Sequence, residues 1–290
     1  MNVLELLIAG LLTVNQAPEI RSHNWKLIDG KHWQLQSGNP IQPQPDLSGG
    51  VCPPGMVHVK GNMKQDPDTN AYSMNTIEEM QKRTCDKWLT KVFPERCQEF
   101  NRDKWLAMSA NLKTKPMDFC EDQFEYPNQI NQYPVIFVNW WEAKRLCEAQ
   151  GKKLPDEEEW TFACEGEEAK PYEYGYSRDD TACVIDKPWH PYHPSQFHPR
   201  NADTTMLELD RLWQGETSGS RAKCKSDFGV YDLTGNIDEW SSAVKVSKFK
   251  SVLNGGYWGR VRTRCRAKTR SHNENHLFYQ QGFRCSKSLN

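Results

Sequence analysis

The sequence lacks a net charge, and it lacks long runs of aliphatic residues. Among its 290 residues, 37 Lys and Arg oppose 38 Asp and Glu, which gives a formal net charge of -1. A nearly neutral chain has no general attraction to nucleic acid or to an anionic membrane surface. Val, Ile and Leu are sparse, whereas the buried strands of a doubly wound sheet need long runs of them. We therefore exclude that fold, and the 11 tryptophans favour a loop-rich domain.

The sequence also lacks a Cys-x-x-Cys pair, although it contains 10 cysteines. They stand at positions 52, 85, 97, 120, 147, 164, 183, 224, 265 and 285. Without such pairs, zinc and iron–sulfur sites are not favoured. An even number of cysteines spread over the chain is typical of disulfides formed in an oxidising compartment. We therefore expect a secreted or periplasmic protein; the alternative is a cytosolic protein with buried thiols.

The first 54 residues divide into two parts. Residues 3–14 read VLELLIAGLLTV, about the length of the apolar region of a signal peptide. They predict a candidate signal peptide at residues 1–17, with a short amphipathic helix as the alternative because Glu5 interrupts the run. Residues 18–54 are polar and punctuated by Pro and Gly, which predicts a linker or an extended arm. No later segment is long and apolar enough to span a membrane.

The rest of the chain, residues 55–290, is interpreted as one domain. Asn139 is a suitable N-cap for a helix that ends before Gly151. Asp156 and Glu159 have the spacing of a capping box and begin a second helix. Residues 75–101 show helical patterning, residues 171–227 read as loop, and the last third contains several strand-like segments.

Five motifs follow one another between Pro134 and Cys285: PVIFVNWWEAKRLC, GKKLPDEEEWTFAC, GVYDLTGNIDEW, NGGYW and GFRC. In this order they resemble the formylglycine-generating enzyme family, also called sulfatase-modifying factors. The resemblance implies an irregular, loop-rich α+β domain, related to C-type lectin folds and stapled by disulfides. Because the motifs cover residues 134–285, we interpret residues 55–115 as an N-terminal extension that carries its own cysteines.

The resemblance also implies part of the disulfide pattern. Carried over from the family, the expected pairs are Cys147–Cys285 and Cys164–Cys265. Cys183 and Cys224 flank the loop-rich region and are expected to pair with each other. The connectivity of Cys52, Cys85, Cys97 and Cys120 stays open.

The residues that carry the family's chemistry are missing. Family members oxidise a substrate cysteine with copper held by two active-site cysteines, and thiolates are natural ligands of cuprous ion. No cysteine occurs from Lys225 to Arg264. Gly259 and its neighbours stand where the first ligand would be, and Tyr257 replaces the serine of the family motif. We expect neither bound copper nor formylglycine-generating oxidase activity.

The family often carries a structural calcium ion beside its GN-V-x-EW motif. By resemblance, the ligands here are the side chains of Asp232 and Glu239 and the carbonyls of Gly235 and Ile237. Oxygen donors that include two carboxylates suit calcium. The alternative is that Asp232 caps a turn and Glu239 pairs with a basic residue.

A run of alternating cations follows the NGGYW motif. If the run is a strand, its cations share one face. They are Arg260, Arg262, Arg264, Arg266, Lys268 and Arg270. With Tyr257 and Trp258, we hypothesise a groove for an anionic glycan, peptide or protein ligand, since arginine forks suit anionic groups. The alternative is a solvated face neutralised by carboxylates such as those of Glu157 to Glu159.

Two functions from different classes follow. The first is a ligand-binding or non-catalytic domain that keeps the family's frame and replaces its groove residues. The second is an oxidative enzyme that tailors proteins or metabolites with a different metal site.

Overall fold

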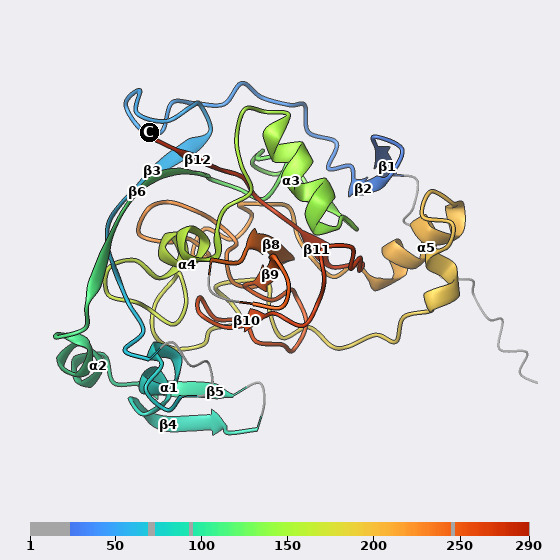
Figure 1. Cartoon of the computed structure of the whole chain (residues 1–290). Helices are drawn as coiled ribbons and strands as arrows, with labels where there is room; N and C mark the ends of the chain where they lie inside the picture. Colours follow the sequence, from blue (N-terminus) through green and yellow to red (C-terminus); the bar gives the residue numbers. More distant parts are fainter. Residues whose placement is uncertain (1–23, 69–72, 93–94, 245–246, 290) are drawn as a thin grey trace, which may run out of the picture.

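The fold combines short strands and short helices with long loops (Figure 1). The computed structural model describes residues 24–68, 73–92, 95–244 and 247–289. The candidate signal peptide at residues 1–17 lies outside the described residues. Over the part that is described, no helix is both long and apolar enough to cross a membrane. The architecture is the loop-rich α+β class that the sequence predicts.

The strands of the described residues form four small sheets. The first contains β1 (Trp25–Ile28), β2 (His32–Leu35) and β7 (Val135–Ile136). The second, at the centre of Figure 1, has the order β10 (Lys268–Thr269), β9 (Ser251–Asn254), β8 (Asp238–Ser242) and β11 (Gln281–Gly282). The third joins β12 (Ser286–Ser288), β6 (Thr114–Asp122) and β3 (Met56–Lys64), and the fourth pairs β4 (Cys85–Thr90) with β5 (Arg96–Phe100).

The two helices predicted in the middle of the chain are confirmed. α3 (Trp140–Glu148) begins after Asn139 and α4 (Glu157–Glu165) after Asp156, each with a complete capping box. In such a box, the cap side chain and the glutamate three residues later satisfy each other's free backbone N–H. The structure also contains α1 (Ile77–Lys82), α2 (Arg102–Ser109), the 3₁₀ turn η2 (Pro194–Phe197) and α5 (Asp203–Leu212). α5 lies in the segment predicted as loop, and no side chain caps its start.

The prediction of a linker over residues 18–54 is wrong for its central part. β1 and β2 form an antiparallel hairpin, and β2 pairs with β7 through Trp33 opposite Ile136. Trp25 and Trp33 are only 8% and 5% exposed. Burial of two large indole rings attaches the hairpin to the domain, which a polar composition does not reveal. Residues 37–54 contain no helix or strand.

The predicted N-terminal extension, residues 55–115, is partly an integral strand of the domain. β3 pairs with β6 over its whole length, from Met56 opposite Asp122 to Lys64 opposite Thr114. β6 in turn pairs with β12 near the C-terminus. The intervening part, with α1, α2 and the β4–β5 hairpin, forms a lobe at one side of the molecule (Figure 1).

The core is centred on a buried ion pair between Glu239 and Arg284. Both side chains are 0% exposed, and Arg284 Nη2 lies 2.6 Å from Glu239 Oε1. Trp160 Nε1 donates to the other oxygen of the same carboxylate at 2.8 Å. Trp240, also 0% exposed, donates its indole N–H to the carbonyl of Val138. Trp160 and Trp240 therefore both lie in the core.

All ten cysteines are joined in disulfides. Three pairs are as predicted, namely Cys147–Cys285, Cys164–Cys265 and Cys183–Cys224. The structure assigns the other two as Cys52–Cys120 and Cys85–Cys97. The two bridges of longest sequence separation attach the helices to the C-terminal part of the chain: α3 is joined to Cys285 and α4 to Cys265.

The prediction of a basic strand over residues 260–270 is wrong. Only Lys268–Thr269 is a strand, β10. The backbone N–H groups of Val261, Thr263 and Arg264 each bond to the carbonyl two residues earlier. This pattern makes tight turns and not an extended ladder. Cys265 does face inward, with 0% exposure.

The cations of this segment are neutralised inside the protein. Four of them pair with carboxylates: Arg262 with Asp238, Arg264 with Glu78, Arg266 with Glu165, and Arg270 with Glu157. Lys268 donates to three oxygens, those of Glu157 (carbonyl), Thr161 and Asn254. The neutralising carboxylates of the alternative are present, with Glu157 among them, but the face is not solvated and most partners lie elsewhere along the chain.

The disulfides predict a graded loss of stability. Cys147 and Cys285 are 138 residues apart, whereas Cys85 and Cys97 are 12 apart. In the chain-entropy model, replacing the first pair with serines costs about 5 kcal/mol and replacing the second about 3 kcal/mol. Urea unfolding of the two double variants measures the difference. An equal or larger loss for the Cys85/Cys97 variant would contradict the expected order.

The ion pairs predict that Arg266 is structural. Arg266→Met leaves Glu165, which is 0% exposed, without its bidentate partner and should cost about 3–5 kcal/mol at pH 7.5. Burial already raises the pKa of Glu165, and loss of Arg266 raises it further. Unfolding stability of the variant should then fall as pH rises above about 4.5, so that the cost is smaller at pH 5.

Arg260→Met is the matched control, because Arg260 is exposed and makes no ion pair within the described residues. It should change the unfolding free energy by no more than about 0.5 kcal/mol. Chemical unfolding at both pH values compares the variants. Equal effects of the two substitutions would show that the Arg266 pair is not the source of stability.

Candidate functional site

A turn that contains two glycines, Gly255 and Gly256, follows β9. Gly255 and Gly256 have φ angles of +80° and +73°, a region that favours glycine. A Cβ on Gly255 would lie 2.1 Å from the carbonyl oxygen of Leu233, so a larger residue does not fit. The turn made by the two glycines fixes the positions of the next two residues, Tyr257 and Trp258.

Tyr257 and Trp258 line a small cavity of about 50 Å³, which we call the aromatic pocket. Its lining consists of Pro188, Trp189, His190, Leu212, Gln214, Tyr257, Trp258, Gly259, Arg260 and Tyr279. The hydroxyls of Tyr257 and Tyr279 are hydrogen-bonded to each other, and burial raises the pKa of both phenols. They are therefore neutral hydrogen-bonding groups. Trp189 is 65% exposed and open to a ligand.

The structure brings together only part of the predicted anion groove. Tyr257, Trp258 and Arg260 all line the aromatic pocket. Arg262, Arg264 and Arg266 do not, because each is held by a carboxylate and is at most 13% exposed. The hypothesis of a wholly basic groove face is thus corrected to one exposed arginine beside aromatic rings.

A larger cleft of about 640 Å³ adjoins the aromatic pocket. We call it the Trp213 cleft, and it is lined by Asn24, Leu35, Gln36, Tyr133, Lys187, Asp210, Trp213, Gln214, Gly215 and Glu216. Gln214 lines both cavities, and the rings of Trp213 and Trp258 meet edge to face with centroids 4.9 Å apart. The two cavities are therefore neighbours, with Gln214 and the packed rings of Trp213 and Trp258 between them.

Sequence reasoning did not find the Trp213 cleft. Its walls come from the β1–β2 hairpin and from α5, which were assigned to a linker and a loop. A signal was present in α5, since Thr205, Leu209 and Leu212 have helical spacing and are buried. Trp213 directly follows this apolar face.

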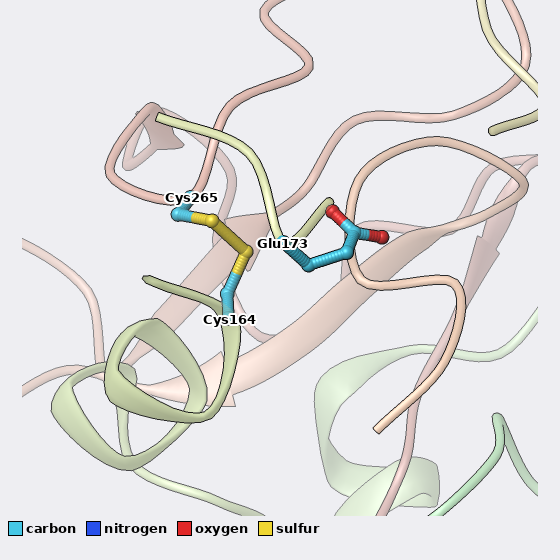
Figure 2. Close-up of side chains that lie close together, drawn as sticks. All are labelled: Cys164, Glu173 and Cys265. Atoms are coloured by element: carbon cyan, nitrogen blue, oxygen red, sulfur yellow. A yellow bond between two sulfur atoms is a disulfide. The ribbon is translucent and has the colours of Figure 1, made fainter. Parts of the chain in front are cut away.

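No thiolate is available to hold copper. The groups of His, Cys, Asp and Glu that lie within metal-binding distance in the described residues are Cys164–Glu173–Cys265 and Glu173–Cys183–Cys224. In both, the sulfurs belong to disulfides; Figure 2 shows the first, with Glu173 beside the bridge. Disulfide sulfur lacks the negative charge that makes a thiolate a ligand. Glu173 itself accepts the backbone N–H of Thr234 at 3.0 Å.

The predicted calcium ligands lie beside the central ion pair. Asp232 is 2% exposed and accepts the backbone N–H of Gly219 at 2.7 Å. Burial raises the pKa of Asp232 to about 7. Both oxygens of Glu239 already accept hydrogen bonds from Arg284, so calcium would have to share this carboxylate with a guanidinium. The donors, two carboxylates and two carbonyls, fit calcium in chemical type.

Curated relatives resemble this chain over about half of its length. It is 28% identical over 178 residues to "Inactive C-alpha-formylglycine-generating enzyme 2" of Bos taurus, which covers 53% of this chain and 50% of that protein. It is 27% identical over 124 residues to "Formylglycine-generating enzyme" of the same organism, covering 38% and 27%. The chain thus spans half or less of the length of these relatives.

Among solved structures, PvdO from Pseudomonas aeruginosa is similar over 86% of this chain and 100% of that chain, with 14% identity and a TM-score of 0.47. The family described as "Sulfatase-modifying factor enzyme 1-like domain" matches residues 60–289, which include the second half of β3 and all five motifs. The geometry agrees, because the motifs meet at the Glu239–Arg284 pair and at the turn of Gly255. This chain therefore belongs to the sulfatase-modifying factor, or formylglycine-generating enzyme, family.

Proposed function

We propose that this protein is a ligand-binding member of its family that does not generate formylglycine. One observation carries the proposal: all ten cysteines are in disulfides, while Tyr257, Trp258 and Gly259 occupy the turn that leads to the family's copper site. Copper-thiolate oxidation needs two free thiolates. The similarity to a relative named as inactive supports the same conclusion.

Ligand binding is supported by the cavities that remain. The aromatic pocket and the Trp213 cleft together present indole rings, phenol rings, amides and a few charged groups. Concave sites with aromatic walls and a small number of polar groups are the usual binding sites for small ligands. The frame around them is cross-linked by disulfides, so little ordering is required when a ligand binds.

The place of action follows from the cysteines. Five disulfides persist only where the surroundings are oxidising, and we propose that the protein is secreted or periplasmic. The alternative of an oxidative tailoring enzyme with another metal site has no supporting ligand set. The described residues offer, beyond disulfide sulfurs, no close group of three His, Cys, Asp or Glu side chains.

The proposal predicts that a sulfatase-type cysteine peptide stays unmodified. The protein, loaded with copper under reducing and non-reducing conditions, is incubated with the peptide, and mass spectrometry follows loss of the thiol and gain of an aldehyde. A formylglycine-generating enzyme in parallel confirms that the peptide is a substrate. Aldehyde above the no-protein background would overturn the proposal.

A structural calcium ion is proposed as well, with Asp232, Glu239 and the carbonyls of Gly235 and Ile237 as its ligands. The supporting observation is the burial of Asp232 close to Glu239, the glutamate that pairs with Arg284. A cation would offset the excess negative charge. Its chemistry is structural, since it holds the loop of Asp232 against β8.

Calcium should therefore raise the thermal midpoint of the wild-type protein relative to EGTA. At a calcium concentration of about 100 times Kd, the expected gain is about 2.7 kcal/mol. Asp232→Asn should abolish the response, whereas Asp103→Asn, at an exposed position in α2, should retain it. Identical midpoints of the wild type in calcium and in EGTA would refute the site.

A further inference from the structure

We infer that the Trp213 cleft binds an uncharged, polyhydroxylated ligand, that is, a segment of a neutral glycan. The inference rests on the proposed ligand-binding function and specifies the class of ligand. It is carried by the construction of the cleft, by its charge balance and by the amides and aromatic rings that line it.

The construction of the cleft suits a ligand that is contacted from several sides. Its volume of about 640 Å³ lies within the ~300–1,000 Å³ typical of small-molecule sites. The walls come from the ends of the β1–β2 hairpin, from Tyr133 and Lys187, and from residues 210–216. No lining residue belongs to the outer strand β1, so the cleft offers no open strand edge to a peptide backbone.

The charges of the cleft compensate one another. Lys187, Asp210 and Glu216 line it, and Glu216 is paired outside it with Arg221 at 2.5 Å. With one ammonium, two carboxylates and this guanidinium, the site attracts neither an anion nor a cation strongly. An apolar ligand is disfavoured too, because it would strip water from these groups without replacing their hydrogen bonds.

A neutral ligand with many hydroxyls matches the amides and aromatic rings that line the cleft. The side-chain amides of Asn24, Gln36 and Gln214 each contain both donors and acceptors. A hydroxyl group can form a hydrogen bond with either, because it both donates and accepts. The rings of Tyr133 and Trp213, whose centroids are 5.8 Å apart, supply apolar surface for the C–H groups of a sugar ring. Polar edges and apolar faces in one small molecule are characteristic of saccharides.

The test uses the full-length protein and a panel of neutral hexose and N-acetylhexosamine oligosaccharides of two to six units, together with sulfated and uronic-acid oligosaccharides. We expect binding to a neutral member with an affinity that changes less than twofold between 50 and 500 mM salt, since no ion pair is formed. Tyr133→Ala removes a partly exposed ring from the cleft wall, and it should weaken binding about five- to tenfold. Gln36→Ala, at an exposed side chain, should weaken it by about fivefold.

Trp141→Phe and Gln42→Ala are matched controls, because both residues are exposed and lie outside the cleft. They should leave the affinity unchanged. Three outcomes would overturn the inference: no oligosaccharide bound, salt-sensitive binding of charged oligosaccharides only, or neutral binding that the cleft variants do not weaken. A peptide or protein ligand would refute the glycan class and leave ligand binding intact, whereas aldehyde formation in the peptide assay would refute the proposed function separately.

Discussion

The buried ion pair between Glu239 and Arg284 is the contact on which the rest of the domain depends. Glu239 comes from β8, Arg284 follows β11, and Trp160 of α4 donates to the same carboxylate. Removing one member of such a pair costs about 3–5 kcal/mol, because the other is left buried and charged. Three of the family motifs therefore have to assemble together, and their common order along the chain reflects one connected structure.

The same principle extends to the outer parts of the domain. Loops make up much of the chain, so long sheets and helices cannot supply its rigidity. Disulfides and buried ion pairs supply the rigidity instead. α4 is an example with one of each, because Cys164 is bonded to Cys265 and Glu165 is paired with Arg266. The turn with Tyr257 and Gly259 takes part in none of these cross-links. A site can therefore lose its copper ligands there while the frame stays folded.

The success of prediction depended on how local the determining contacts were. The capping boxes of α3 and α4 involve residues three apart, so the sequence alone predicted both helix starts. The alternating arginines led to a wrong prediction of a strand. Side chains that alternate along the sequence share one face only where the backbone is extended. Here tight turns replace the strand. Glu78, the partner of Arg264, lies almost two hundred residues away along the chain, so no local pattern reveals this pair. Two disulfides, Cys147–Cys285 and Cys164–Cys265, were predicted from the family resemblance, and Cys183–Cys224 from its place at the ends of a loop-rich region.

The elements that sequence reasoning missed are those that build the Trp213 cleft. The β1–β2 hairpin and α5 meet where Trp25 Nε1 donates to Asp210 at 3.0 Å and where the rings of Trp25 and Trp213 pack edge to face. Neither element contains a family motif, yet both rest on the motif-bearing frame, through β7 and through Trp258. Segments that vary on a rigid scaffold are where binding specificity usually resides. The proposed ligand site is therefore built by residues outside the motifs that identify the family.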